Sequence, residues 1–224
     1  GVAANQANSE NGRVYKGRSL RELLLSNTWD VVTIQQVSTL SGKGNSYDPY
    51  LKNLIDFIKT LQPKAEIMLH ETWAYRSDAT GFTQTNTGSA KTEMEMWQQL
   101  RAAYQSYSKL YNLRIIPVGD AFWKVSSDNT WKFKKDLNYN YTSPAFPNLP
   151  DQSNSLHVGY YWNGTTFAFD SHHASVAGCY LGSLTWYHAL FKQSPAKLKY
   201  QPISLSNPFA EFLKSCAIAA IAEN

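Results

Sequence analysis

Asp170 and His173 are the pair of residues whose types and spacing most directly suggest chemistry. A carboxylate three residues before a histidine can turn back onto the Nδ1–H of the imidazole. That contact would fix the tautomer and leave Nε2 free to take a proton from a nucleophile. We expect the pair to follow the last strand-like segment and to open a helix. In the competing interpretation Asp170 caps this helix through the backbone N–H of His172 or His173, and both roles can coexist.

A second group of polar side chains ends the first predicted strand. Gln35, Gln36 and Ser38 follow a run of β-branched residues, so they should lie at the carboxyl edge of the sheet. Amides and hydroxyls placed there can donate hydrogen bonds to a developing oxyanion. The glutamines could equally serve only to satisfy carbonyl groups of the following loop.

A third group ends the second predicted strand. Trp73 and Tyr75 are expected to line the wall of a pocket. A zinc-protease motif is absent, because no second histidine follows His70 at helical spacing. Metal-dependent hydrolysis remains an alternative, and it would use His70, Glu71, Asp170 and His173. The favoured interpretation includes neither a metal nor a cofactor.

Hydrophobic periodicity predicts the elements that must position these residues. Compact apolar runs predict strands over 30–35, 65–70 and 113–118, and apolar residues spaced by three and four predict helices over 50–61, 93–111, 175–191 and 206–222. A shorter helix should begin with a capping box formed by Ser19 and Glu22. Strands alternating with helices imply right-handed crossovers, and hence an α/β fold whose parallel sheet carries helices on both faces.

Residues 122–169 interrupt this alternation with many aromatic residues, prolines and asparagines. Because the segment is long for an unstructured connection, short strands or turns are expected inside it. Its aromatic rings either pin it to the body of the protein or form a wall of the substrate site. The sequence contains no internal repeat and therefore predicts a single domain over 1–224, with an aromatic-rich insertion at 122–169.

The composition narrows the class of protein. With 43% hydrophobic residues, the 224-residue chain can bury a substantial core, which excludes a disordered tail. The net charge of +4 comes from scattered basic residues, so the chain offers no electrostatic footprint for nucleic acid. No apolar run approaches the roughly 18 residues of a membrane span. Cys179 and Cys216 are expected to be buried free thiols, with a bridge between them as the alternative.

Several segments together resemble a bacterial branch of the SGNH (GDSL-like) hydrolase superfamily. They are Trp29–Ser41, Thr72–Tyr75 and Asp170–Leu181. The resemblance implies a flavodoxin-like, three-layer α/β/α fold and hydrolysis of esters, often acetyl groups on carbohydrates. It also implies a Ser–His–Asp triad without metal, in which Asp170 and His173 match the last block and His172 occupies the variable position between them.

Two blocks of that superfamily are absent from the sequence. The first carries the nucleophilic serine as Gly-Asp-Ser or Gly-Asn-Ser, and the second carries an oxyanion-hole glycine. Gly119-Asp120-Ala121 has alanine in place of the serine and follows the wrong strand. The strand at Asp30 matches the third strand of the superfamily. We therefore expect a domain that lacks its first strands and the N-terminal segment that bears them, with the strand at 31–35 paired on one side only.

We therefore expect an esterase or deacetylase of the SGNH type that acts on a small-molecule or glycan ester. His173 would serve as general base and then as general acid, Asp170 would orient it, and Gln36 and Ser38 would help hold the oxyanion. The alternative is a non-catalytic carbohydrate-binding protein on the same scaffold, with the aromatic segment as its platform. Aromatic richness and the resemblance favour a secreted or periplasmic location.

Overall fold

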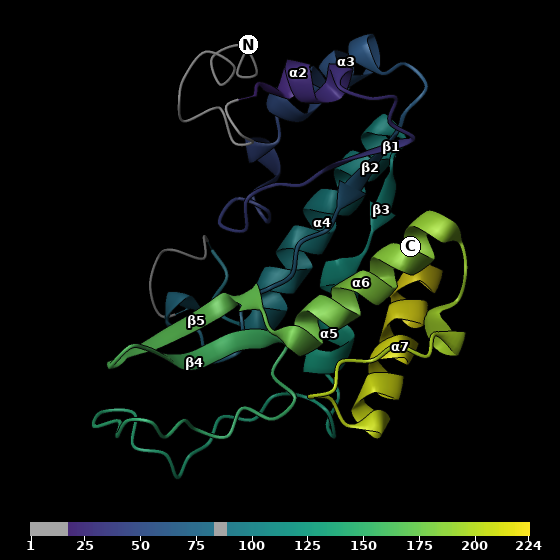
Figure 1. Ribbon diagram of the computed structural model, residues 1–224. Coiled ribbons are helices and arrows are strands. Elements are labelled where there is room, and N and C mark those ends of the chain that lie inside the picture. The colour runs from purple at the N-terminus through teal and green to yellow at the C-terminus, as the bar shows by residue number, and fades with distance from the viewer. Residues whose placement is uncertain (1–17, 83–88) are drawn as a thin grey trace.

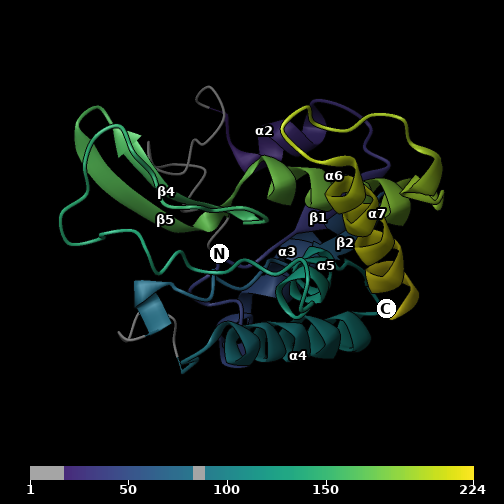
Figure 2. The ribbon, with the colours of Figure 1, turned by 90° about the horizontal axis from the view of Figure 1, so that it is seen from below.

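A three-stranded parallel sheet forms the centre of the computed structural model, which describes residues 18–82 and 89–224. Its strands are β1 (Val31–Ile34), β2 (Glu66–His70) and β3 (Arg114–Ile116), in the order β1-β2-β3. Helices α3 (Tyr50–Leu61) and α4 (Glu93–Tyr111) cover one face. Helices α5 (Val118–Ser126), α6 (Val176–Phe191) and α7 (Asn207–Ala222) cover the other face (Figure 2). This is the predicted three-layer α/β/α fold.

The periodic segments form elements close to their predicted bounds. Helices α3 and α4 coincide with the predicted ranges, and α6 and α7 each begin one residue later because a serine caps the helix. The short helix α2 (Leu20–Leu25) packs beside α3 and begins with the predicted capping box of Ser19 and Glu22. Single 3₁₀ turns lie at Gly44–Ser46, Thr80–Phe82 and Pro195–Lys197.

Strand β2 is the buried centre of the sheet. Met68 packs against the cluster formed by α5, α6 and α7, whereas Leu69 packs against α3 and α4 on the opposite face. Both side chains are almost fully buried, because neighbouring residues of a strand point to opposite faces and helices cover each face here.

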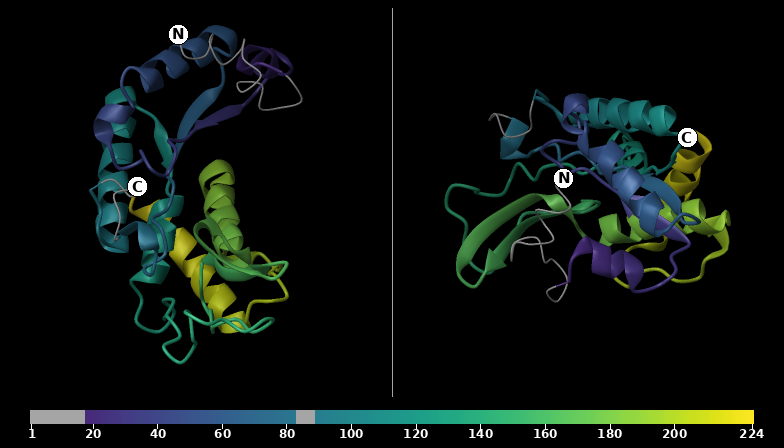
Figure 3. Two further views of the ribbon diagram at one scale, coloured as in Figure 1. Left: turned by 90° about the vertical axis from the view of Figure 1, so that its left-hand side faces the viewer. Right: turned by 90° about the horizontal axis from the view of Figure 1, so that it is seen from above.

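Strand β1 pairs only with β2 among the described residues, so its other edge is free. All four of its residues are half-buried. Within the described ranges, the predicted one-sided pairing is therefore confirmed. Figure 3 shows β1 at the margin of the sheet, with helices above and beside it.

Residues 122–169 contain more regular structure than predicted. The segment begins inside α5 and ends inside an antiparallel hairpin of β4 (His157–Asn163) and β5 (Thr166–Ala174). This hairpin projects from the body of the protein (Figure 1). Asp170 and His173 lie on β5, not at the start of a helix, so that part of the prediction is wrong. Helix α6 begins only at Val176, after the chain has left the hairpin.

Two expectations drawn from composition can be compared with the fold. Cys179 and Cys216 are both free thiols; Cys216 is buried as expected, but Cys179 is exposed. Within the described ranges, no helix combines the length and hydrophobicity that crossing a bilayer requires.

Candidate active site

Asp170 and His173 form a direct hydrogen bond on β5. Nδ1 of His173 lies 2.6 Å from Oδ2 of Asp170. Because an ionised carboxylate only accepts hydrogen bonds, the imidazole donates from Nδ1, and its Nε2 carries a free lone pair in the neutral form. The His173 side chain is 72% exposed, so a reacting group can approach it from solvent. The pair has the arrangement that a general base needs.

The Asp170 carboxylate is held in place by the backbone that follows it. Its Oδ1 accepts hydrogen bonds from the amides of His172 (3.1 Å) and His173 (2.9 Å). Burial alone would raise the pKa of this carboxyl group, but the His173 and His172 amides and the His173 side chain outweigh burial and lower the pKa to about 2. Asp170 is therefore ionised at neutral pH. It makes the backbone contacts of a cap as well as the imidazole contact, although both occur in a strand.

An irregularity in the hairpin brings the two histidines together. His157 pairs with Ala174 and Gly159 pairs with Asp170, so residues 171–173 of β5 face the single residue 158 of β4. Adjacent residues of a regular strand point to opposite faces, and a bulge removes this alternation. The rings of His172 and His173 consequently lie 4.3 Å apart between centroids.

Arg76 holds this irregular part of the hairpin in place. Its guanidinium is fully buried, pairs with Asp78 through two hydrogen bonds of 2.7 and 3.0 Å, and donates to Gln152. Its backbone N–H donates to the carbonyl of Ser171, directly before the histidines. Gly159 has φ +74°, and a Cβ there would collide with the Arg76 and Gln152 side chains. Arg76 was not predicted as a site residue; the available signal was an arginine two residues before an aspartate, Asp78, in the loop after β2.

The ends of β1 and β2 meet the hairpin through three of the predicted residues. The indole Nε1 of Trp73 donates to the carbonyl of His172 over 2.8 Å. The Tyr75 ring lies 5.5 Å from the His172 ring, and its hydroxyl lies 2.9 Å from Oγ of Ser38. The structure thus brings Trp73 and Tyr75 to His172, next to the Asp170–His173 pair, and Ser38 adjoins them through Tyr75.

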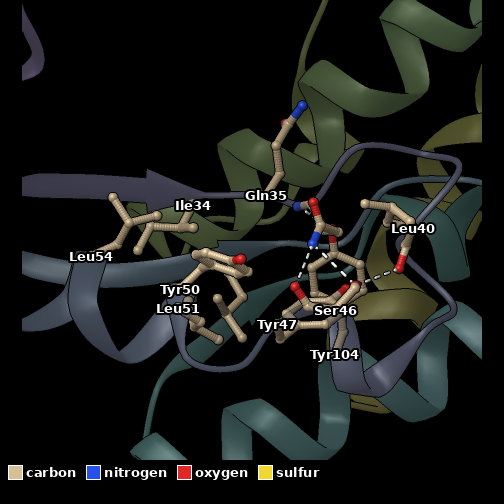
Figure 4. Close-up of a pocket in the computed structure, with 11 residues that line it drawn as sticks. Ile34, Gln35, Leu40, Ser46, Tyr47, Tyr50, Leu51, Leu54 and Tyr104 are labelled. Carbon is tan, nitrogen blue, oxygen red and sulfur yellow. Dashed lines mark hydrogen bonds between the residues drawn. The ribbon is translucent and has the colours of Figure 1, made fainter. Parts of the chain in front are cut away.

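The two predicted glutamines are engaged elsewhere. The amide of Gln36 donates to the carbonyl and hydroxyl oxygens of Ser46 (3.3 and 3.1 Å) and accepts from the backbone N–H of Val37. These bonds agree with the alternative in which the glutamine satisfies polar groups of the following loop, and not with an oxyanion donor. Gln35 accepts a 2.6 Å hydrogen bond from Nδ1 of His70. Gln35 is also among the residues that line the cavity at the end of β1, and Figure 4 shows its side chain pointing away from those of Ile34 and Leu54.

The four-residue metal site considered from the sequence is not assembled. Among the described residues, the histidines and carboxylates close enough to share an ion are Asp170, His172 and His173, without His70 and Glu71. Burial lowers the pKa of His70 to about 4, so this imidazole is neutral at pH 7. It lies instead in an apolar cavity of about 570 Å³ between the end of β2 and α6, next to the hairpin, whose lining also includes Trp73, Ala174, Gly178 and Trp186.

Glu71 fastens the end of β2 to the start of α5. Its carboxyl group is fully buried and accepts a 3.1 Å hydrogen bond from the backbone N–H of Asp120. Burial, followed by the negative charge of Asp120, raises the pKa of Glu71 well above its ordinary value. Asp120 itself is paired with Arg101 at 2.9 Å. Glu71 therefore has a structural role, and its ionisation destabilises the folded protein.

Comparison with known proteins gives one family and one solved structure. Residues 13–141 match the family described as "Domain of unknown function (DUF4886)". The crystal structure of a DUF4886 family protein from Bacteroides uniformis ATCC 8492 is similar in fold, with a TM-score of 0.70 and 22% sequence identity. The similarity covers 93% of this chain and 68% of that chain. No curated protein matches the chain.

Replacing Asp78 with asparagine is expected to destabilise the protein by about 3–5 kcal/mol, because it leaves the buried Arg76 charge without its partner. Urea unfolding measures this change. The matched control is Lys52→Ala, which removes an exposed pair with Asp56 and should change stability by less than about 1 kcal/mol. Equal effects of the two substitutions would contradict the anchoring role of Arg76.

Replacing Glu71 with glutamine is expected to stabilise the protein increasingly as the pH rises above about 4.5. The raised pKa means that Glu71 binds a proton more tightly in the folded state than in the unfolded state. The free energy of unfolding of the wild type therefore falls as the pH rises above about 4.5. Glutamine removes the titration and keeps the acceptor for Asp120. Unfolding by urea between pH 4.5 and 8 measures the difference.

The control for this pH series is Glu66→Gln at an exposed pair with Arg114. The hydrogen bond from Arg114 lowers the pKa of Glu66, so its stabilising effect is already complete above pH 5. The difference between this variant and the wild type should therefore stay constant from pH 5 to 8. If the difference between Glu71→Gln and the wild type were also constant, the raised pKa of the buried Glu71 carboxyl group would be refuted.

Proposed function

Starting from a chain that belongs to the DUF4886 family, we propose that this protein is a serine hydrolase of the SGNH type, an esterase or deacetylase for small-molecule or glycan-derived esters. The observation that carries the proposal is the hydrogen bond between His173 Nδ1 and Asp170 Oδ2. It supplies an oriented imidazole with an accessible Nε2, which is the central requirement of a Ser–His–Asp mechanism.

The proposed reaction assigns successive roles to these two side chains. Nε2 of His173 takes the proton of the serine hydroxyl while its oxygen attacks the ester carbonyl. Asp170 stabilises the imidazolium that results and keeps the ring in place. The imidazolium then gives the proton to the leaving alcohol, and an acyl-serine remains. His173 next activates a water molecule, which releases the acid and restores the serine.

We propose that a segment outside these 224 residues supplies the serine and adds a strand to the edge of β1 that is unpaired among the described residues. Proteins rarely leave such an edge uncovered, because its unpaired N–H and C=O groups invite aggregation. An apolar cavity of about 270 Å³ opens at the end of the same strand, lined by Ile34, Tyr50, Leu54 and Tyr104 among other residues (Figure 4). Its lining offers apolar contacts to the side chains of an added strand.

The surroundings of the pair offer places for the other parts of an ester. Gln36 is bound to its own loop, so we propose the Ser38 hydroxyl, which contacts the Tyr75 hydroxyl, as the oxyanion donor. The cavity between β2 and α6 begins at Ala174, the residue after His173, and includes Trp73 and Trp186. Aromatic rings of this kind suit the faces of a sugar or an acyl group.

The carbohydrate-binding alternative rests on the aromatic segment, whose rings pack mainly on one another. Tyr160 stacks on Phe169 at 4.3 Å and on Phe167 at 5.3 Å, and Tyr139 stacks on Phe167 at 5.8 Å. Rings that cover each other's faces stabilise the hairpin, as in the interpretation of a segment pinned by its own aromatic residues. Binding without catalysis stays a prediction. An assay of ester hydrolysis distinguishes it from the proposed enzyme.

Substitution of the pair should abolish hydrolysis of p-nitrophenyl acetate by the natural full-length protein. We expect His173→Ala to lower kcat by about 10⁴-fold or more, and Asp170→Asn by about 10³–10⁴-fold, because members of a triad act as a unit. The matched control is His188→Gln on α6, outside the site, which should retain the wild-type rate.

Equal rates in His173→Ala and the wild type would end the catalytic role of this histidine. Absence of turnover by the wild type, together with binding of an acetylated oligosaccharide in a calorimeter, would favour the carbohydrate-binding alternative. Circular dichroism of each variant ensures that the rates compare folded proteins.

A further inference from the structure

Three potential metal ligands converge on the bulge of β5. One nitrogen or oxygen atom from each of Asp170, His172 and His173 lies within 4.8 Å of the others. Nδ1 of His172 is 3.3 Å from Oδ1 of Asp170, and Nδ1 of His173 is 2.6 Å from Oδ2. We propose that these three side chains bind a divalent transition-metal ion such as Zn²⁺, and that the bound ion inhibits the hydrolase.

The donor set and spacing suit zinc. Imidazole nitrogens and carboxylate oxygens bind Zn²⁺ at about 2.0–2.2 Å, so two donors of a tetrahedral site are about 3.3 Å apart. The His172–Asp170 separation already has this value, and the His173–Asp170 contact needs only a small rotation of the exposed imidazole. Two histidines and one carboxylate leave a fourth position for water.

The backbone around the ligands is fixed before any ion arrives. The amides of His172 and His173 hold the Asp170 carboxylate, and the Trp73 indole holds the carbonyl of His172. Such supporting hydrogen bonds orient ligands and raise metal affinity.

The chemistry of the imidazole makes the ion an inhibitor. A neutral histidine with zinc on Nδ1 carries its proton on Nε2, so the lone pair that would accept the serine proton is lost. The ion also takes the place of the Nδ1–H that Asp170 orients. This second half of the proposal rests on the proposed function, whereas zinc binding does not.

The exposure of the ligands supports inhibition and not zinc catalysis. The side chains of His172 and His173 are 47% and 72% exposed. Catalytic metal sites use a dry, shaped cavity around the ion, whereas these ligands lie on the surface of the hairpin. An exposed site of this kind suits reversible binding of an ion from solution.

Calorimetric titration of the EDTA-treated natural protein with ZnCl₂ tests the site. The wild type should bind one ion per chain, and His172→Ala and His172→Gln should each weaken binding at least about tenfold. The control His188→Gln should bind as the wild type does. Wild-type affinity in both folded His172 variants, checked by circular dichroism, would overturn the site.

The rate of p-nitrophenyl acetate hydrolysis tests the inhibition separately. Zinc at saturating concentration should suppress wild-type hydrolysis at least tenfold, and EDTA should restore it. A rate that is unchanged or higher with zinc bound would overturn the inhibition. Zinc binding by a protein that hydrolyses nothing in the absence of zinc would overturn the proposed function and its inhibition, and would leave the metal site standing.

Discussion

The hydrogen bond from His173 to Asp170 depends on an irregular strand that other residues must hold. Three residues of β5 oppose one residue of β4, and this arrangement places both histidines near the same carboxylate. The bulge needs Gly159 in a left-handed conformation directly above the Arg76 guanidinium. A buried charge thereby supports an exposed imidazole, and the stability of the hairpin and the chemistry of the pair rest on the same contacts.

The parallel sheet contributes the second half of the site. Strand β2 is buried on both faces, and the residues that follow it reach the hairpin through Trp73 and Tyr75. The end of β1 adds Ser38 through its contact with Tyr75. One edge of β1 is unpaired in the part of the chain that the structure describes, and the proposed function places the serine on a strand that would cover this edge.

Local patterns in the sequence were enough to predict the three strands of the sheet and helices α3, α4, α6 and α7, because each has a clear apolar pattern. Helix α5 was missed because its apolar residues continue from β3 across Pro117 without a polar break. Asp170 was placed at a helix start because the bulge on β5 has no local signature. Arg76 escaped because its role comes from partners 76 and 79 residues away, Gln152 and Ser155, which sequence spacing does not reveal.

The tautomer of His173 tests the central claim most directly. Nitrogen-15 NMR of the histidine side chains at a pH where the ring is neutral distinguishes a protonated Nδ1 from a protonated Nε2. The hydrogen bond to the ionised Asp170 predicts that the proton resides on Nδ1, and that Asp170→Asn removes this preference. A wild-type His173 with its proton mainly on Nε2 would contradict the account, since that imidazole could not accept a proton from serine.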